Sequence, residues 1–414
     1  MHIGLVTQWF PPESPSLASW TMAKALLDRG HQVDVITGFP NYPHGKLYPG
    51  YKVRPYLRES IEGITVHRGP LFPSHDRNPI KRVANYASFS LGAIPTSYRI
   101  PEPDVWLTNS TPVTVSIPGL LHRATRKTPH AQIIQDLWPD SLTGTGIVGD
   151  GTAKALTSIL TPACSVSYAL SDSIGVISPG MATLLQSRGV PASKLEFVPN
   201  GIDDSHLLPS VAASDELKAA LGLPPGRVFM YAGNFGRLQN LQNLVVAFSR
   251  VPEANLVLVG SGIEEDSIRA AAQGAANVHI LPRQPVERIG QYIAAADVQI
   301  VSLVDSPLLR ATMPGKVQAA LAAGRPVLSH AAGDAATVIT SAGAGIAADP
   351  TDPSAAASSI SDLLSRPNSE LRSMGARARL AYEAEYSPAA ASLRLETFLL
   401  RAIKNANQRL HGLS

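Results

Sequence analysis

Cysteine, charge and long apolar runs are all scarce in this sequence, and each scarcity excludes a class of protein. The single cysteine, Cys164, can form no intramolecular disulfide and can supply no thiolate zinc cluster, which favours a reducing compartment. No stretch approaches the roughly 20 consecutive apolar residues that span a bilayer, and the N-terminus lacks the basic and long apolar segments of a signal peptide. We therefore expect a cytoplasmic protein that does not cross a membrane.

Charged residues make up only 16% of the chain, and Lys plus Arg (35) exceed Asp plus Glu (32) by three. Such a small surplus produces little long-range field, so we expect no binding to nucleic acid. Hydrophobic residues are plentiful at 44%, and 414 residues are too many for one ordinary core. The composition therefore predicts two globular domains.

Short apolar runs typical of buried strands alternate with helical stretches, beginning with a strand at residues 3–7 and a helix at residues 17–29. Such alternation predicts open parallel sheets with right-handed crossovers. Further strands of the first half are expected at residues 33–37, 64–67, 105–107, 132–134, 174–177 and 195–198. Beyond a polar linker near residues 202–212, strands are expected at residues 228–231, 256–259, 278–281, 298–301 and 327–328, and helices at 370–385 and 389–405.

The fold class predicted from this pattern is α/β, with two Rossmann-like, doubly wound domains. We place the first domain at residues 1–205 and the second at residues 206–385. Residues 386–414 are expected to form a C-terminal helix that crosses back to the first domain. In doubly wound sheets ligands bind outside the carboxyl ends of the strands, so the loops that follow the strands are the candidate sites.

The strongest local signal is a two-glycine turn, Gly233 to Gly236, where a strand ends and a helix begins. Glycines permit close backbone approach and a helix N-terminus favours an anion, while Arg237 could contact a diphosphate through two hydrogen bonds. The alternative is an ordinary glycine-rich turn with a solvated arginine. Because no complete Gly-x-Gly-x-x-Gly with a later acid is present, dinucleotide binding is disfavoured.

A second candidate is the loop that enters a helix at Pro314-Gly315-Lys316. The free N–H groups of Gly315 and Lys316, together with the Lys316 ammonium, would form a diphosphate cradle, and Gln318 could bond a ribose hydroxyl. The alternative is that Lys316 and Gln318 only solvate an exposed face.

Acceptor candidates lie in the first half of the chain. Asp136, after a central strand, could orient an acceptor hydroxyl or stabilise an oxocarbenium-like transition state, and the alternative is a loop-structuring role. Residues 46–99 contain nine Lys or Arg against three Asp or Glu, interleaved with aromatic residues. This composition suits an anionic membrane surface and a lipid-diphosphate acceptor, or else an ordinary solvated surface. His75, in the same region, could contact acceptor or backbone.

Taken together, these segments resemble the family 4 glycosyltransferases of the GT-B fold over residues 1–385, and especially the WbuB-like branch of O-antigen and capsule transferases. The resemblance rests on the segments 29–33, 37–43, 136–141, 199–203, 233–234, 314–316 and 324–327. It implies retaining transfer from a nucleoside diphosphate sugar, usually a UDP-sugar, without an essential metal or other cofactor. We expect a hexosyl or N-acetylhexosaminyl transfer to a hydroxyl of a lipid-linked polysaccharide precursor, by an enzyme that contacts the inner face of the membrane peripherally.

The resemblance also assigns residues. It makes the first domain the acceptor-binding one and the second the donor-binding one, with catalytic roles for Asp136, Arg237 and Lys316. The donor-binding residues it implies are Gly233, Asn234, Arg237, Gln239, Arg283, Gly315, Lys316 and Gln318. The acceptor-binding residues are Asn41, Tyr42, His75 and Asp136. Retention without a second carboxylate suggests a front-face mechanism, in which the leaving phosphate accepts the proton of the incoming hydroxyl.

The sequence departs from the family pattern at five positions. Gln135 stands where many relatives carry a His, so no His general base is assigned there. Asn234 and Gln239 replace an Arg and a Lys of the wider family, so Arg237 must supply much of the positive charge that binds the phosphates. Arg310 and Gln318 replace a pair of glutamates in the donor loop, which leaves the donor sugar open. Other functions remain open as well: transfer to a soluble natural product, epimerisation of a UDP-sugar by a GT-B protein, or sugar-nucleotide binding without catalysis.

Overall fold

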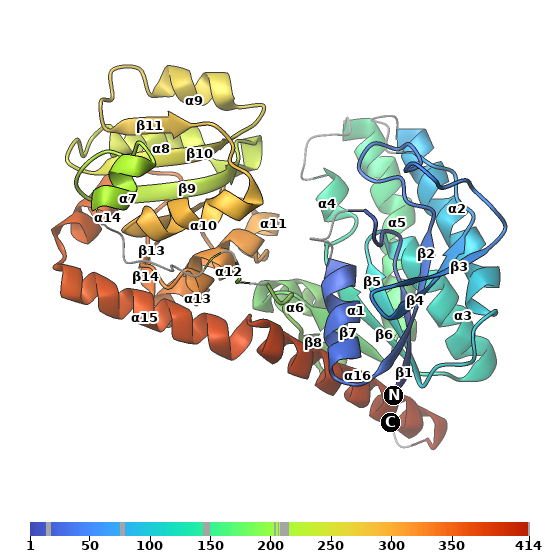
Figure 1. Ribbon diagram of the computed structural model, residues 1–414. Helices are drawn as coiled ribbons and strands as arrows, with labels where there is room; N and C mark the ends of the chain where they lie inside the picture. Colours follow the sequence, from blue (N-terminus) through green and yellow to red (C-terminus); the bar gives the residue numbers. More distant parts are fainter. Residues whose placement is uncertain are drawn as a thin grey trace. The chain divides into compact units, whose positions relative to one another are not determined.

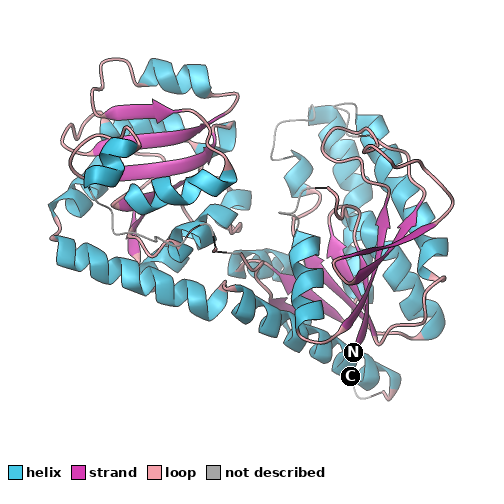
Figure 2. Ribbon diagram, in the orientation of Figure 1, coloured by secondary structure: helices cyan, strands magenta, loops and turns pink. Residues whose placement is uncertain are grey.

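The computed structural model describes residues 1–13, 18–74, 79–143, 150–202, 204–205, 207 and 215–412. The chain forms two compact units, which we call the first unit (Met1–Gly201 with Ala391–Ser414) and the second unit (Ile202–Ala390). Each unit contains one sheet flanked by helices (Figures 1 and 2). The acceptor candidate His75 and most of the linker expected at residues 202–212 lie outside the described residues.

The sheet of the first unit has eight strands in the order β3-β4-β2-β1-β5-β6-β7-β8. Neighbouring strands run parallel except for the edge pair β3–β4, which is antiparallel. The strand order reverses between β1 and β5, so their carboxyl ends flank a switch point. The strands are β1 (His2–Val6), β2 (Gln32–Gly38), β3 (Leu57–Ile61), β4 (Ile64–Gly69), β5 (Val105–Ser110), β6 (His130–Ile134), β7 (Ser173–Val176) and β8 (Leu195–Phe197).

Helices of the first unit connect these parallel strands, as the alternating pattern predicts. They are α1 (Ala18–Asp28), α2 (Pro79–Ser97), α3 (Ile117–Arg126), α4 (Asp140–Thr143), α5 (Asp150–Leu170) and α6 (Pro179–Ser187), with the short 3₁₀ helices η1 (Val113–Ser116) and η2 (Ala192–Lys194). The apolar runs that define the strands fill the core: Ile3, Leu5, Val35, Leu107, Ile133 and Ile174 are all fully buried.

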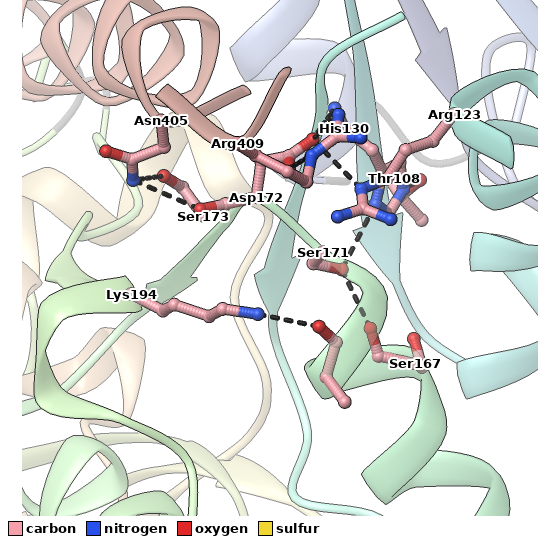
Figure 3. Close-up of polar contacts among 11 residues, drawn as sticks. Thr108, Arg123, His130, Ser167, Ser171, Asp172, Ser173, Lys194, Asn405 and Arg409 are labelled. Atoms are coloured by element: carbon pink, nitrogen blue, oxygen red, sulfur yellow. Dashed lines mark hydrogen bonds and ion pairs between the residues drawn. The ribbon is translucent and has the colours of Figure 1, made fainter. Parts of the chain in front are cut away.

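The last helix, α16 (Pro388–Leu410), belongs mainly to the first unit, which confirms the expected return of the C-terminus. Its docking centres on the buried Asp172 (Figure 3). The Asp172 carboxylate accepts hydrogen bonds from Arg409 Nε (2.9 Å), Arg123 Nε (3.1 Å) and the His130 N–H (3.0 Å). Asn405 donates to the Asp172 carbonyl at 3.1 Å. The buried face of the helix consists of Ala391, Ser392, Leu395, Phe398, Leu399, Ala402 and Ala406.

The sheet of the second unit is entirely parallel, in the order β11-β10-β9-β12-β13-β14. Its switch point lies between β9 and β12. The strands are β9 (Val228–Asn234), β10 (Asn255–Ser261), β11 (Val278–Leu281), β12 (Val298–Ser302), β13 (Val327–His330) and β14 (Gly345–Ala347). The helices are α7 (Asp215–Ala220), η3 (Arg237–Gln239), α8 (Leu241–Phe248), α9 (Glu265–Ala271), α10 (Val286–Ala295), α11 (Pro307–Arg310), α12 (Gly315–Ala322), α13 (Asp334–Ser341), α14 (Pro353–Ser365) and α15 (Asn368–Glu385).

Candidate donor and acceptor sites

The candidate donor site begins where β9 ends, at the switch point of the second unit. Gly233 and Asn234 are the last two residues of β9, and the Tyr231 hydroxyl donates to the Asn234 carbonyl at 2.8 Å. Gly233 has φ 149°, and a Cβ on the neighbouring Gly260 would lie 1.9 Å from the Gly233 carbonyl oxygen. The close approach of β9 and β10 therefore requires glycine at position 260 and holds the turn rigidly.

Lys316 lies against this turn. Its ammonium is 5.4 Å from the centroid of the Tyr231 ring, and a Cβ added to Gly233 would lie 2.8 Å from Lys316 Nζ. Within the part of the chain that the structure describes, no carboxylate pairs with Lys316. Burial lowers the pKa of Lys316 below its ordinary value. The structure thus brings together two residues that the sequence separates by more than 80 positions.

The Lys316 side chain extends from the first turn of α12, which begins at Gly315 after Pro314. No side chain caps this N-terminus, and nothing lies within 4 Å of a Cβ built on Gly315. The N–H groups at the start of a helix have no intrahelical partner and carry the positive end of the helix dipole. This end of the helix and the Lys316 ammonium therefore provide a positive surface suited to a diphosphate.

The remaining donor candidates have different surroundings. Arg237 is largely exposed, and its Nε lies 3.3 Å from the Glu264 carboxylate. Gln239 accepts a hydrogen bond from the Gly236 N–H at 3.1 Å and thereby closes the turn. Gln318 is buried, which contradicts the alternative that it solvates an exposed face. Arg283 is exposed beyond the edge strand β11.

Arg310 is neutralised within its own loop. It contacts both carboxylate oxygens of Asp305, at 2.5 Å and 2.6 Å, and this pairing lowers the pKa of Asp305. Asp305 follows β12 by three residues, so it lies in the loop that leaves the switch point. Arg310 stands where relatives carry an acid, which the sequence reveals, but nothing in the sequence marks Asp305, because a lone acid in a loop gives no sign of its partner.

The candidate acceptor site lies at the carboxyl edge of the first unit's sheet. Asp136 follows β6, and Thr111, which follows β5, donates to the Asp136 carboxylate at 3.3 Å. Asp136 is accessible, yet desolvation by the surrounding protein raises its pKa. Gln135, next to Asp136, exchanges two hydrogen bonds with Asn200, at 3.0 Å and 2.7 Å. Gln135 therefore holds the loop in place and supplies no catalytic base.

Of the other acceptor candidates, Asn41 is buried and its side-chain amide donates to the Phe39 carbonyl at 2.9 Å. It therefore shapes the loop after β2. Tyr42 is half-buried, with its ring 5.0 Å from that of Trp9. A buried acid absent from the sequence prediction, Glu13, accepts the backbone N–H groups of both Asn41 and Tyr42. The available signal is an acid directly after Pro11-Pro12, in the loop that follows the first strand.

Comparison with known families matches both units. The model described as "Glycosyl transferase 4-like domain" covers residues 17–201, and the model described as "Glycosyl transferases group 1" covers residues 226–366. The chain belongs to the family 4 glycosyltransferases. This confirms the resemblance found in the sequence, and it makes the protein a glycosyltransferase that uses a nucleoside diphosphate sugar.

This family 4 glycosyltransferase is 27% identical, over 329 residues, to WcaI of Escherichia coli K12, a protein named as a colanic acid biosynthesis glycosyl transferase. The match covers 76% of this chain and 79% of WcaI. Among solved structures, sucrose-phosphate synthase of Thermosynechococcus elongatus matches with a TM-score of 0.73 at 18% identity, over 100% of both chains. HepE of Anabaena in complex with UDP matches with a TM-score of 0.70 at 15% identity, over 97% of this chain and 100% of HepE. These likenesses confirm the GT-B fold.

The described residues contain no group of three His, Cys, Asp or Glu side chains arranged to hold a metal ion. None of their helices is both long enough and apolar enough to cross a membrane.

Proposed function

We propose that this family 4 glycosyltransferase transfers a sugar from a UDP-sugar, with retention of configuration, to a hydroxyl of a lipid-linked polysaccharide precursor. The observation that supports donor binding is the Lys316 ammonium, which lies against the Gly233 turn and has no carboxylate partner among the described residues. A desolvated cation is unfavourable unless a ligand neutralises it. The diphosphate of the donor is the anion that the family's chemistry supplies, and the UDP complex of the similarly folded HepE supports uracil as the base.

In the proposed reaction the bond between the anomeric carbon and the diphosphate oxygen breaks as the acceptor oxygen bonds to the same face of that carbon. The proton of the acceptor hydroxyl passes to the leaving diphosphate, so a separate general base is unnecessary. Lys316 and the N-terminus of α12 would stabilise the charge that grows on the diphosphate, and Arg237 would move in to assist. Asp136 would orient the hydroxyl and stabilise positive charge on the sugar ring.

The outer face of α2 supports a lipid-linked acceptor and peripheral contact with a membrane. Val83, Leu91 and Tyr98 are exposed near one face of the helix and just beyond its end, with Leu91 70% exposed. The helix contains no acidic residue and carries Lys81 and Arg82 in its first turns. Exposed apolar side chains beside basic ones suit the interface of an anionic bilayer. The name of WcaI, a colanic acid biosynthesis protein, also supports a polysaccharide product.

A thermal-shift comparison of UDP, GDP, ADP and their sugars tests the donor half of the proposal. We expect UDP and its sugars to raise the melting temperature most. A melting temperature that none of these nucleotides changes would contradict donor binding.

Kinetics of Lys316→Ala and Arg237→Ala at saturating donor test the catalytic roles. Each variant should lose kcat while keeping its thermal stability, because the two cations would act mainly on the charge of the transition state. Normal kcat in both variants would refute the assignment.

Sedimentation with phosphatidylglycerol vesicles tests the membrane contact. Wild-type protein should sediment with them, and Leu91→Glu should not, because a carboxylate at the centre of the apolar face opposes insertion. Ile263→Glu is the matched control, since Ile263 is also highly exposed but lies in the second unit. Equal sedimentation of wild type and Leu91→Glu would remove the membrane from the proposal.

A further inference from the structure

Two aromatic side chains at the carboxyl edge of the first unit have no part in the mechanism above. Trp9 lies three residues beyond the end of β1, and Tyr42 lies four residues beyond the end of β2. Their ring centroids are 5.0 Å apart with an interplanar angle of 39°, and both side chains are only half-buried. The pair therefore presents aromatic surface to solvent at the same edge of the sheet as Asp136.

Glu13 holds the loops that carry these two rings. Its carboxylate, 2% exposed, accepts hydrogen bonds from the N–H groups of Phe10 (2.9 Å), Asn41 (2.8 Å) and Tyr42 (2.8 Å). Phe10 directly follows Trp9, so one bond fixes the β1 loop and two fix the β2 loop. A charged acceptor makes each of these bonds stronger than a neutral one would.

Arg68 holds the same two loops through their carbonyl groups. It is fully buried, and it donates to the carbonyl of Gly38 at 2.8 Å and to that of Pro11. Buried Glu13 thus joins the β1 and β2 loops through their N–H groups, and buried Arg68 joins them through their carbonyl groups. Burying charge is unfavourable, so an arrangement with two buried charges implies that the relative position of these loops matters.

We propose that Trp9 and Tyr42 form the surface on which a pyranose ring of the acceptor stacks, with Glu13 as the positioning residue that holds the two rings together. This inference rests on the proposed function, because it names the part of the acceptor that the first unit recognises. The C–H face of a pyranose carries partial positive charge and packs on the negative face of an aromatic ring. The polar rim of the sugar then remains free to place a hydroxyl at Asp136.

The charged surroundings of Glu13 predict that this surface depends on pH. Desolvation raises the pKa of Glu13 to about 7, against the lowering effects of its backbone hydrogen bonds and of Arg68. Glu59 on β3 pairs with Arg68, and the Tyr51 hydroxyl donates to Glu59 at 3.1 Å. As the pH falls through 7 the Glu13 carboxyl takes up a proton and loses acceptor capacity toward the three N–H groups. The aromatic surface should then loosen.

Binding of methyl glucoside and methyl N-acetylglucosaminide to the full-length protein, followed by saturation-transfer NMR, tests the stacking surface. We expect Trp9→Ala to weaken glycoside binding roughly tenfold, the loss of one aromatic contact of about 1.4 kcal/mol. Trp20→Phe is the matched control, because Trp20 contacts Phe10 from α1 at 5.6 Å between ring centroids and lies outside the proposed surface. Wild-type glycoside affinity in Trp9→Ala, or no glycoside binding by the wild type, would overturn the inference.

UDP calorimetry on the same proteins separates this inference from the proposed function. Trp9→Ala should bind UDP as the wild type does, because the candidate donor residues lie in the second unit. Failure of the wild type to bind UDP would count against the proposed function. Normal UDP binding with unaltered glycoside binding in Trp9→Ala would count against the stacking surface alone.

Glu13→Gln tests the positioning role through its pH profile. Wild-type glycoside affinity should fall as the pH is lowered from 8 to 6, whereas Glu13→Gln should bind weakly at all three pH values 6, 7 and 8 because glutamine does not titrate. A Glu13→Gln variant with the wild-type pH profile would show that Glu13 has no such role. If this variant fails to fold, Trp9→Ala still decides whether the surface binds sugar.

Discussion

Replacing Lys316 with methionine separates the contribution of this residue to ligand binding from its contribution to folding. UDP at 100 times its Kd stabilises a binding protein by about 2.7 kcal/mol, which raises the melting temperature of a unit of this size by roughly 5 to 10 °C. A hydrogen bond to a charged group contributes about 2 kcal/mol. Loss of the bond from Lys316 to the diphosphate should therefore weaken UDP binding about thirtyfold. The same UDP concentration then stabilises by only about 0.9 kcal/mol. Differential scanning fluorimetry should show the UDP shift reduced to about one third.

Without UDP, Lys316→Met should be at least as stable as the wild type. Burial lowers the folded-state pKa of Lys316 below the ordinary 10.5, so at neutral pH the folded protein carries an unfavourable charge. That penalty is present below the folded pKa and disappears as the pH rises toward 10.5. Methionine removes it at every pH. The control is Lys24→Met, an exposed residue with contacts of 3.7 Å to Asp28 and Glu62. A lower melting temperature without UDP, together with an unchanged UDP shift, would refute this reasoning.

Three further predictions follow from close contacts and buried groups. Gly260→Ala should destabilise the protein by about 1–3 kcal/mol in urea denaturation, because its Cβ would lie 1.9 Å from the Gly233 carbonyl oxygen. The same displacement should abolish the rise in melting temperature that UDP causes, and a retained rise would contradict this. Arg409→Ala should cost about 1–3 kcal/mol in urea by removing a partner of the buried Asp172, and a change below about 0.5 kcal/mol would argue against that docking. Burial lowers the pKa of His130 to about 3, so its stabilising effect is complete above the ordinary 6.5 and is lost as the pH falls toward 3. His130 alone should therefore contribute about 2 kcal/mol of lost stability between pH 7 and pH 5, and His130→Gln should reduce the loss by about that amount in pH-dependent denaturation.

The sequence predicts the central strands well because they are buried on both faces and appear as continuous apolar runs. It misses β3, whose residues Arg58, Glu59 and Ser60 belong to a half-exposed edge strand and resemble a loop. It also misses β14, a three-residue strand at the edge of the second sheet. A strand at a sheet edge is paired on only one side and can form without an apolar run, so hydrophobicity alone does not mark β3 or β14.

Part of the candidate site could also be predicted, because the loops after parallel strands meet at one edge of a sheet. Residue types mark Gly233 and Lys316 as two separate phosphate candidates, and the family resemblance implies that both face the donor. They lie side by side in the second unit, although their binding of phosphate stays a prediction. The partners of single acids could not be predicted. Glu13 is paired with backbone N–H groups about 28 residues away, and Asp305 with an arginine that spacing alone does not mark as bonded.

The return of α16 to the first unit has a consequence for recombination between relatives. The chain leaves the first unit after Gly201 and re-enters it at Ala391, so the second unit is one uninterrupted insert. A single gene segment could therefore exchange one second unit for another, provided that both junctions are kept. A chain cut after residue 201 would instead lack the helix that covers Asp172, and an isolated first unit would have to be built by joining residues 1–201 to 391–414.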